Sequence, residues 1–160
     1  MSTLSQDHHP TLRHADREAV GVELQTVLVV LTDLALIGKQ LHWNIVGPHF
    51  RSLHLQLDES IDEWRLAADD VAERAVALGH SPDGRVATVA ERTPLAAPDA
   101  GPLADADVVA RITSLLTDAV GVARGACERV EDVDVVTADM LHGVIETLER
   151  QLWMYRVQAA

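Results

Sequence analysis

The stretch QLHWNIVGPHFRSLHLQLDE, from Gln40 to Glu59, concentrates side chains that are sparse in the rest of the chain. It contains three histidines, one tryptophan and two adjacent carboxylates, and the pair Gly47-Pro48 interrupts it. A glycine followed by a proline marks a turn or a loop. The stretch therefore predicts the end of one helix, a turn and the start of a second helix, with histidines on both sides of the turn.

Outward from this turn, apolar residues recur at helical spacing in both directions. The pattern predicts one helix over about residues 16–46 and a second over about residues 51–78. Gly79 is expected to stop the second helix. No alternation typical of strands stands out.

The next segment, residues 80–104, contains four prolines and two glycines, so it is a long connection with room for a short helix over residues 85–91. A third long helix is expected over residues 105–130, and a fourth with Thr137 as its N-cap and running through Tyr155. Four long helices with one long crossover between the second and third predict an all-α, ferritin-like four-helix bundle. Residues 1–16 are expected to form a flexible polar tail, and residues 17–160 the domain.

Composition limits the classes of function. The chain has 160 residues, 48% of them hydrophobic, with a net charge of −12 and a pI near 4.9. An acidic surface repels nucleic-acid phosphates and attracts cations. The single cysteine, Cys127, excludes an intrachain disulfide and is expected in the core. No signal peptide and no membrane-length apolar run is visible, so a cytoplasmic protein without a membrane partner is expected.

Four ionisable residues of the second helix lie on one stripe. Relative to His54, the positions of Asp58, Asp69 and Glu73 fall at about 40°, 60° and 100° around the helix axis. Burying such a charged stripe against another helix costs free energy unless other groups neutralise the charges. The two pairs cannot form one site within one chain, because their centres are about 22 Å apart along the helix.

An antiparallel copy of the same helix resolves this separation. A two-fold axis near Glu63 and Trp64 would place the His54 and Asp58 of one chain opposite the Asp69 and Glu73 of another. His42, near the end of the preceding helix, could reach the same place. Nitrogen and oxygen ligands together suit iron, manganese or zinc. The Glu-x-x-His motif of ordinary di-iron bundles does not occur in this chain, which favours a site between subunits.

These residues resemble the signature of the Dps family, the DNA-binding proteins from starved cells, also called miniferritins. The similarity extends from about Leu24 to Tyr155 and includes TADMLHGVIETLERQLWM, residues 137–154. Its motif residues are His42-Trp43-Asn44, Gly47, Phe50, Leu53-His54, Asp58-Glu59, Asp69 and Ala72-Glu73-Arg74.

The resemblance implies a hollow dodecamer built from two-fold dimers, with no organic cofactor. It implies a ferroxidase that oxidises Fe(II), preferably with hydrogen peroxide, at intersubunit sites of two irons each, stores ferric mineral and protects against oxidative damage. Matched by position, the ligands are His42, His54 and Asp58 from one subunit, and Asp69 and Glu73 from its partner. Trp43 would take up an oxidising equivalent beside the centre, although packing in the core also explains a tryptophan there.

Two further clusters have a functional and a simpler interpretation. The acidic turn around Glu131, Asp134 and Asp139 resembles the family's three-fold pore, whereas acids near a helix N-terminus are also favoured by the macrodipole. The tail residues Asp7, His8, His9 and His14 could bind metal, and a tail without a specific site is the simpler alternative.

Three functions compete on the sequence alone. The first is the ferroxidase and iron store; its ligand stripe could instead be a solvated face with pairs such as Arg65–Asp69. The second is a nucleoid-associated, DNA-compacting stress protein, which the absence of lysine from the tail disfavours: twelve subunits would carry a formal charge of −144. The third is a helical oligomer without metal chemistry.

Overall fold

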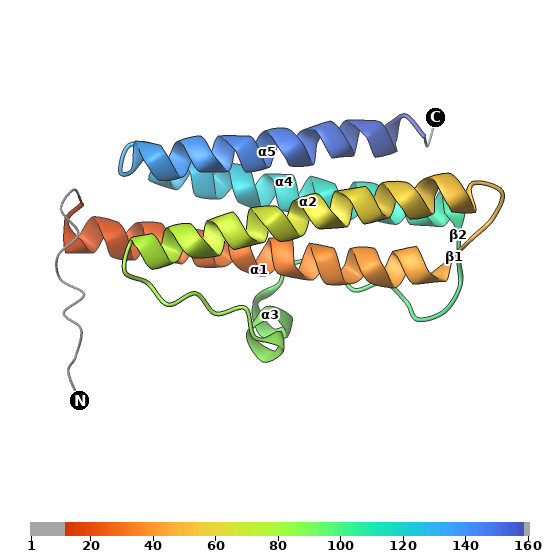
Figure 1. Ribbon diagram of the computed structural model, residues 1–160, viewed down its shortest axis with the longest axis horizontal. Coiled ribbons are helices and arrows are strands. Elements are labelled where there is room, and N and C mark those ends of the chain that lie inside the picture. The colour runs from red at the N-terminus through yellow and green to blue at the C-terminus, as the bar shows by residue number, and fades with distance from the viewer. Residues whose placement is uncertain (1–11, 159–160) are drawn as a thin grey trace.

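The computed structural model describes residues 12–158, in which four long helices form a bundle and a fifth, short helix lies outside it (Figure 1). The four long helices lie roughly antiparallel to their sequence neighbours, except across the crossover. The bundle helices are α1 (His14–Asn44), α2 (Phe50–Ala77), α4 (Asp105–Val130) and α5 (Val135–Arg156), and the short helix of the crossover is α3 (Val86–Arg92).

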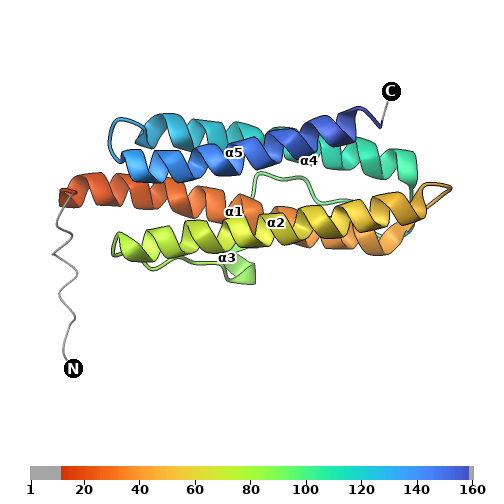
Figure 2. The same cartoon turned by 45° about the horizontal axis from the view of Figure 1, so that its top comes forward.

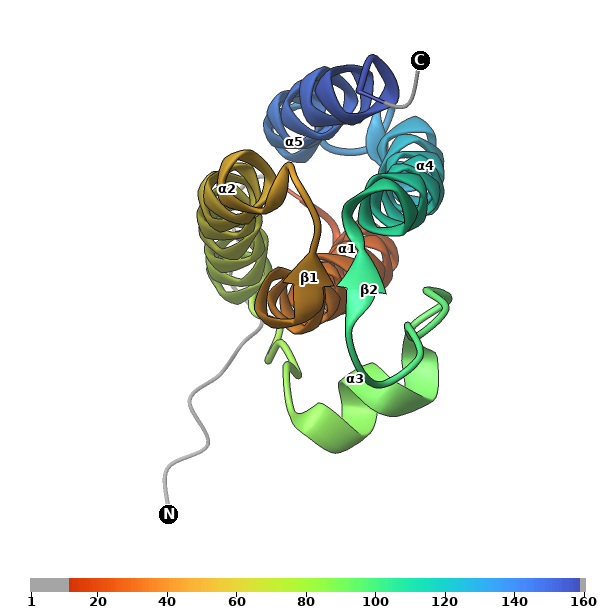
Figure 3. The same cartoon turned by 90° about the vertical axis from the view of Figure 1, so that its right-hand side faces the viewer.

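The apolar faces of the four long helices meet in one core. Figure 3 shows the four helices from the end of the bundle. Helix α1 packs against α2 and α4, and α4 also packs against α5 (Figure 2). Helix α3 lies against α1 outside the bundle (Figure 3). Leucine, valine, isoleucine and alanine fill most of the core, and Cys127 is buried in it as predicted. The two large aromatic residues inside it keep polar partners: the indole of Trp64 donates to Gln151, and the Tyr155 hydroxyl lies 3.2 Å from that of Ser60.

The predicted fold class is confirmed, including the short helix in the crossover between the second and third bundle helices. Helix α4 has the predicted limits, and α2 and α3 each lie within one residue of theirs. Helix α1 begins at His14, so residues 14–16 belong to it rather than to the tail. Residues 1–11 lie outside the described part of the chain, so the rest of the proposed tail stays a prediction.

Gly79 stops α2 as predicted. Its φ of 88° lies in the left-handed region that only glycine adopts without cost, and its N–H donates to the carbonyl of Val76. The next N–H, that of His80, reaches back to the carbonyl of Ala75. These two bonds form a Schellman motif, which satisfies the last carbonyls of the helix.

The predicted N-cap of the last helix is wrong. Helix α5 begins at Val135, so Asp134 is the N-cap residue and Thr137 lies inside the first turn. The Thr137 hydroxyl instead donates to the carboxylate of Asp134 at 2.5 Å, and Arg74 from α2 donates to the same carboxylate. Threonine is a common N-cap, but the contact with Arg74 comes from a distant helix, so the local sequence pattern did not reveal it.

A short strand pair was also not predicted. Strand β1 (Ile45–Val46), directly after α1, pairs in parallel with β2 (Leu103–Ala104), directly before α4. Figure 3 shows the two lying side by side at one end of the bundle. Two residues are too few for a strand periodicity in sequence, and the partners are 58 positions apart.

Helix α1 is long and apolar enough to cross a membrane by length and composition, with an 18-residue window of mean hydropathy 1.9. The expectation that no membrane-length apolar run exists is therefore wrong. Within the bundle 61% of that window is buried, and the core helix of a bundle meets the same criteria as a membrane span. The apolar run is explained by its place in the core.

Candidate metal centre

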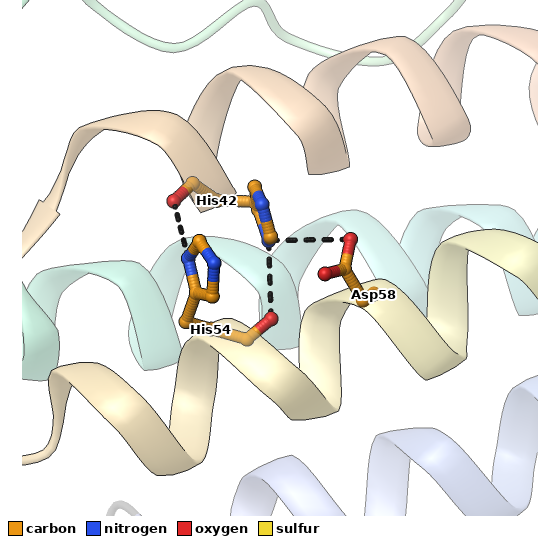
Figure 4. A group of neighbouring side chains, drawn as sticks. All are labelled: His42, His54 and Asp58. Carbon is orange, nitrogen blue, oxygen red and sulfur yellow. Dashed lines mark hydrogen bonds and ion pairs between the residues drawn. The ribbon is translucent and has the colours of Figure 1, made fainter.

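Three potential metal ligands meet near the end of the bundle that carries β1 and β2. His42 lies in the last turn of α1, His54 in the second turn of α2, and Asp58 one turn further along α2 (Figure 4). Their ligand atoms all lie within 4.8 Å of one another, and they form the one such group of three among residues 12–158. The α1–α2 turn therefore does what the sequence predicted, because it brings together histidines that are twelve positions apart.

The two histidines orient each other through the backbone. Nδ1 of His42 lies 3.0 Å from the carbonyl oxygen of His54, and Nδ1 of His54 lies 3.2 Å from the carbonyl oxygen of His42. Because a carbonyl oxygen can only accept, each Nδ1 must carry the hydrogen. In the neutral rings Nε2 then keeps the lone pair that a metal requires. The rings also stack, with their centroids 3.6 Å apart.

Burial favours the neutral form of His42. Only 5% of the residue is exposed, and this burial lowers the pKa of its imidazole, although the hydrogen bond to the His54 carbonyl and the charge of Asp58 act in the opposite direction. A neutral imidazole is the form that binds a metal. The ring of Phe50 covers His54 at a centroid distance of 4.9 Å.

Asp58 has a cationic partner that the sequence pattern did not predict. The ammonium of Lys39 forms an ion pair with one carboxylate oxygen of Asp58, and Nδ1 of His42 lies 3.4 Å from the same oxygen. This hydrogen bond from Lys39 is the main reason why the pKa of Asp58 lies below its ordinary value. The signal was present in the sequence, since Lys39 is the only lysine and lies three positions before His42 on the same helical face.

Asp69 and Glu73 do not join the three ligands within one chain. Both are exposed on α2, and Asp69 lies eleven residues beyond Asp58, about 16 Å along the helix. The hypothesis of a solvated face expected an ion pair between Arg65 and Asp69. Arg65 instead pairs with Asp62, at 3.8 Å. The chain therefore presents one assembled half of the predicted ligand set, and a separate exposed half.

Trp43 is not packed in the core of this chain. It directly follows His42, and 70% of it is exposed. Core packing within the chain therefore does not explain this tryptophan.

The three acids of the predicted pore differ in their surroundings. Glu131 and Asp139 are exposed near the N-terminal end of α5. Asp134 is only 7% exposed and accepts hydrogen bonds from Thr137 and Arg74, which hold its pKa below the ordinary value although burial alone would raise it. Asp134 therefore anchors α5 to α2, and we retain only Glu131 and Asp139 as candidates for a pore.

Of the four residues proposed for a metal site in the tail, only His14 lies in the described part of the chain. Asp7, His8 and His9 lie outside the described residues, and His14 is the exposed first residue of α1. A metal site there stays a prediction.

The assembled half-site suits a divalent transition metal. Two imidazoles and one carboxylate match the mixed nitrogen and oxygen preference of Fe(II), Mn(II) and Zn(II). His54 and Asp58 are partly exposed, so an ion and further ligands can reach the cluster from outside. Three ligands leave coordination positions open, which is typical of a centre that performs chemistry rather than one that is only structural.

The chain is also similar to known proteins over most of its length. A ferritin-like domain family matches residues 22–160. The DNA protection during starvation protein 1 of Deinococcus radiodurans is 34% identical over 153 residues, covering 92% of this chain and 72% of that protein. The fine tangled pili major subunit of Haemophilus ducreyi is 31% identical over 147 residues, which cover 92% of this chain and 78% of that protein. The solved structure of Mycobacterium smegmatis Dps in a tetragonal form is 28% identical with a TM-score of 0.91, covering 99% of this chain and 94% of that one.

Proposed function

Because this chain belongs to the Dps family of ferritin-like proteins, we propose that it is an iron-storage ferroxidase. It oxidises Fe(II), preferably with hydrogen peroxide, at sites shared between two subunits, and it retains the ferric product as mineral. This activity would protect the cell against oxidative damage. The observation that carries the proposal is the cluster of His42, His54 and Asp58.

The site is completed by a second copy of the chain. Three protein ligands from one subunit leave open positions, and the matching carboxylates Asp69 and Glu73 are exposed on α2. An antiparallel α2 from a two-fold partner brings those carboxylates to the cluster, giving two sites in each dimer. The completed ligand set is His42, His54 and Asp58 with the partner's Asp69 and Glu73.

The surface next to the cluster supports a subunit contact. Leu36 and Trp43 lie seven residues apart on α1, so they share one face of the helix, and they are 52% and 70% exposed. Large apolar side chains gathered on one exposed face are typical of protein interfaces. A partner that covers this face would also lie beside His42.

The chemistry follows from the ligand types. Two Fe(II) ions each lose one electron to one hydrogen peroxide molecule, whose O–O bond breaks; two protons are taken up and two water molecules leave. Carboxylates are hard ligands and stabilise the Fe(III) that forms. Because two irons at one site supply both electrons together, no hydroxyl radical is released. Trp43 beside the centre supplies an electron when only one iron is present.

The assembly proposed for this protein is a dodecamer in the cytoplasm. Acidic residues around three-fold axes, Glu131 and Asp139 among them, would draw Fe(II) inward, because rings of carboxylates select cations. The net charge of −12 on each chain favours the same movement.

A ferroxidase assay on the assembled protein tests the proposal. Anaerobic loading with Fe(II) is followed by limiting hydrogen peroxide, with optical detection of ferric mineral and a radical trap. The double variant His54→Ala, Asp58→Ala is expected to oxidise iron more than about tenfold more slowly, since loss of even an outer partner of a ligand costs at least that much. His142→Ala, which removes an exposed histidine on α5, is the matched control and should behave as wild type. Equal rates in the double variant and wild type would instead favour a structural oligomer.

The alternative function is a DNA-binding, nucleoid-compacting stress protein. The name of the Deinococcus radiodurans relative, which refers to DNA protection, favours this alternative. The net charge of −12 opposes it, because affinity for DNA comes largely from neutralising phosphates. We expect no gel shift of duplex DNA at moderate salt; a shift that persists there would give the nucleoid role priority.

A further inference from the structure

The two histidines of the cluster are connected by an exposed turn. Residues 46–50 are all exposed, and the turn joins the end of α1 to the start of α2. His42 lies on one side of the turn and His54 on the other, and each ring is oriented by the other residue's carbonyl. The relative position of the two helix ends therefore decides where both Nε2 atoms point.

The support for this turn comes from the start of α4, about sixty residues later in the chain. Ile45 and Val46 of β1 pair with Leu103 and Ala104 of β2, at the end of the molecule seen in Figure 3. Directly after β2, one carboxylate oxygen of Asp105 accepts the backbone N–H of His49 at 2.9 Å. The other oxygen accepts the N–H of Ala106 at 2.9 Å, in the first turn of α4. One side chain thus connects the α1–α2 turn to the N-terminus of a different bundle helix.

Gly47 makes room for this carboxylate. Its φ is 137°, a conformation that side chains other than hydrogen rarely adopt, and an added Cβ would lie 2.6 Å from the Asp105 carboxyl group. Glycine at position 47 and aspartate at position 105 therefore fit each other. The N-terminus of α4 also favours a negative charge at Asp105, its first residue.

We propose that Asp105 is a positioning residue for the metal centre: by binding the backbone of the α1–α2 turn, it fixes the separation at which His42 and His54 present their Nε2 atoms. This inference rests on the proposed function, since it concerns the same site. Asp105 does not belong to the ligand cluster among the described residues, so its effect is transmitted through the turn. Outer residues that orient metal-binding histidines change affinity by about tenfold to a hundredfold.

Binding of Co(II), a redox-inert probe of the same charge, tests the inference on the full-length assembled protein. Affinity is measured by calorimetry, and coordination by the visible absorption of bound Co(II). The variants are Asp105→Ala, Asp105→Asn, His54→Ala and, as the matched control, Asp107→Ala. Asp107 is also an acid in the first turn of α4 and is exposed. Hydrogen exchange at residues 45–50 is followed without metal.

Asp105→Ala is expected to weaken Co(II) binding about tenfold and to alter the Co(II) spectrum, with faster exchange in residues 45–50 and at Ala106, whose N–H also loses its acceptor. Asp105→Asn keeps an acceptor oxygen and should recover most of the affinity, and Asp107→Ala should match wild type. Wild-type affinity and spectrum in Asp105→Ala, or unchanged exchange in the turn, would overturn the positioning role. If His54→Ala also binds Co(II) as wild type does, the metal centre itself is wrong, and the exchange data still decide whether Asp105 holds the turn.

Discussion

At the scale of single residues, Lys39 and Asp58 show how the centre is maintained before metal arrives. The ammonium of Lys39 holds the carboxylate of Asp58 in place, with Nδ1 of His42 3.4 Å from the same oxygen. Lysine is suited to this role, because its ammonium is a compact charge on a flexible stem and can swing away, whereas the planar guanidinium of arginine binds a carboxylate through two fixed bonds. Lys39 therefore both prepares the ligand and competes with the ion that it will bind.

Replacing Lys39 by glutamine is expected to tighten the binding of a divalent cation by about tenfold, because the metal no longer displaces a positive charge from Asp58. The same change should raise the pKa of Asp58 towards its ordinary value, since the hydrogen bond from Lys39 is the main cause of its lowering. Calorimetry with Zn(II) measures the first effect, and carboxyl NMR signals the second.

Lys39→Arg is the control for this prediction, since it retains the positive charge and should not tighten the binding of Zn(II). Weaker Zn(II) binding in Lys39→Gln than in wild type would show that the lysine mainly supports Asp58 rather than competing with metal.

The same residues show what a sequence can reveal about a site. His42, His54 and Asp58 were predicted because their spacings place them on facing helices next to a Gly-Pro turn. Lys39 and Asp105 were not predicted to act at the site, because each acts through a contact with a different helix or turn: Asp58 is 19 positions from Lys39, and His49 is 56 positions from Asp105. Asp69 and Glu73 stay predictions, because a single chain cannot test a site between subunits.

At the scale of whole elements, the contact of α2 with the start of α5 rests on a buried ionic network. Arg74 donates to both Asp134 and Thr137, and Thr137 donates to Asp134. The network fixes the α4–α5 turn, which carries Glu131, against the half of α2 that carries Glu73. It therefore connects the candidate pore to the exposed half of the ligand set.

Asp134→Asn is expected to lower the free energy of unfolding by about 3 kcal/mol at neutral pH, because it leaves Arg74 half-buried without its counter-charge. The folded-state pKa of Asp134 lies below its ordinary value of 3.8, so its ionised form stabilises the fold at pH values above 3.8. That contribution is lost as the pH falls through the folded-state pKa. The difference between wild type and variant should thus shrink as the pH falls below 3.8, as measured by urea denaturation.

A matched exposed pair separates this effect from charge in general. Arg124 and Glu149 form an ion pair between α4 and α5 with both side chains well exposed, so Glu149→Gln should cost less than about 1 kcal/mol. Equal losses of unfolding free energy in Asp134→Asn and Glu149→Gln would mean that burial of Asp134 does not strengthen its ionic network.

Helix limits were predictable where local chemistry determines them, as at Gly79 and over the whole of α4. The start of α5 was not predictable. Its Asp134 carboxylate and Thr137 hydroxyl accept hydrogen bonds from the guanidinium of Arg74 on another helix, instead of forming a simple N-cap. The β1–β2 pair was likewise invisible, since it depends on where the crossover returns to the bundle.

At the scale of the whole molecule, the exposed apolar face of α1 indicates how copies of the chain associate. Leu36 and Trp43 are large, exposed and on one side of α1, and Lys39 lies between them in sequence. An interface that covers this face would exclude water from the side of the cluster on which Asp58 is exposed. Dimer formation and metal affinity should therefore depend on the same residues.

Leu36→Glu places a charge on that face and is expected to weaken the dimer at least about tenfold, since an unpaired charge buried in an interface costs several kcal/mol. Analytical ultracentrifugation measures the change in assembly, and Co(II) titration of the same samples measures the affinity of the centre. Val157→Glu is the control, because Val157 is also exposed and apolar but follows the end of α5. If Leu36→Glu separates the subunits while Co(II) binds as in wild type, then one chain alone forms the complete centre, and Asp69 and Glu73 of a partner are not ligands. If assembly and affinity fall together, the centre is shared, because every ligand that this chain assembles by itself is untouched by the substitution.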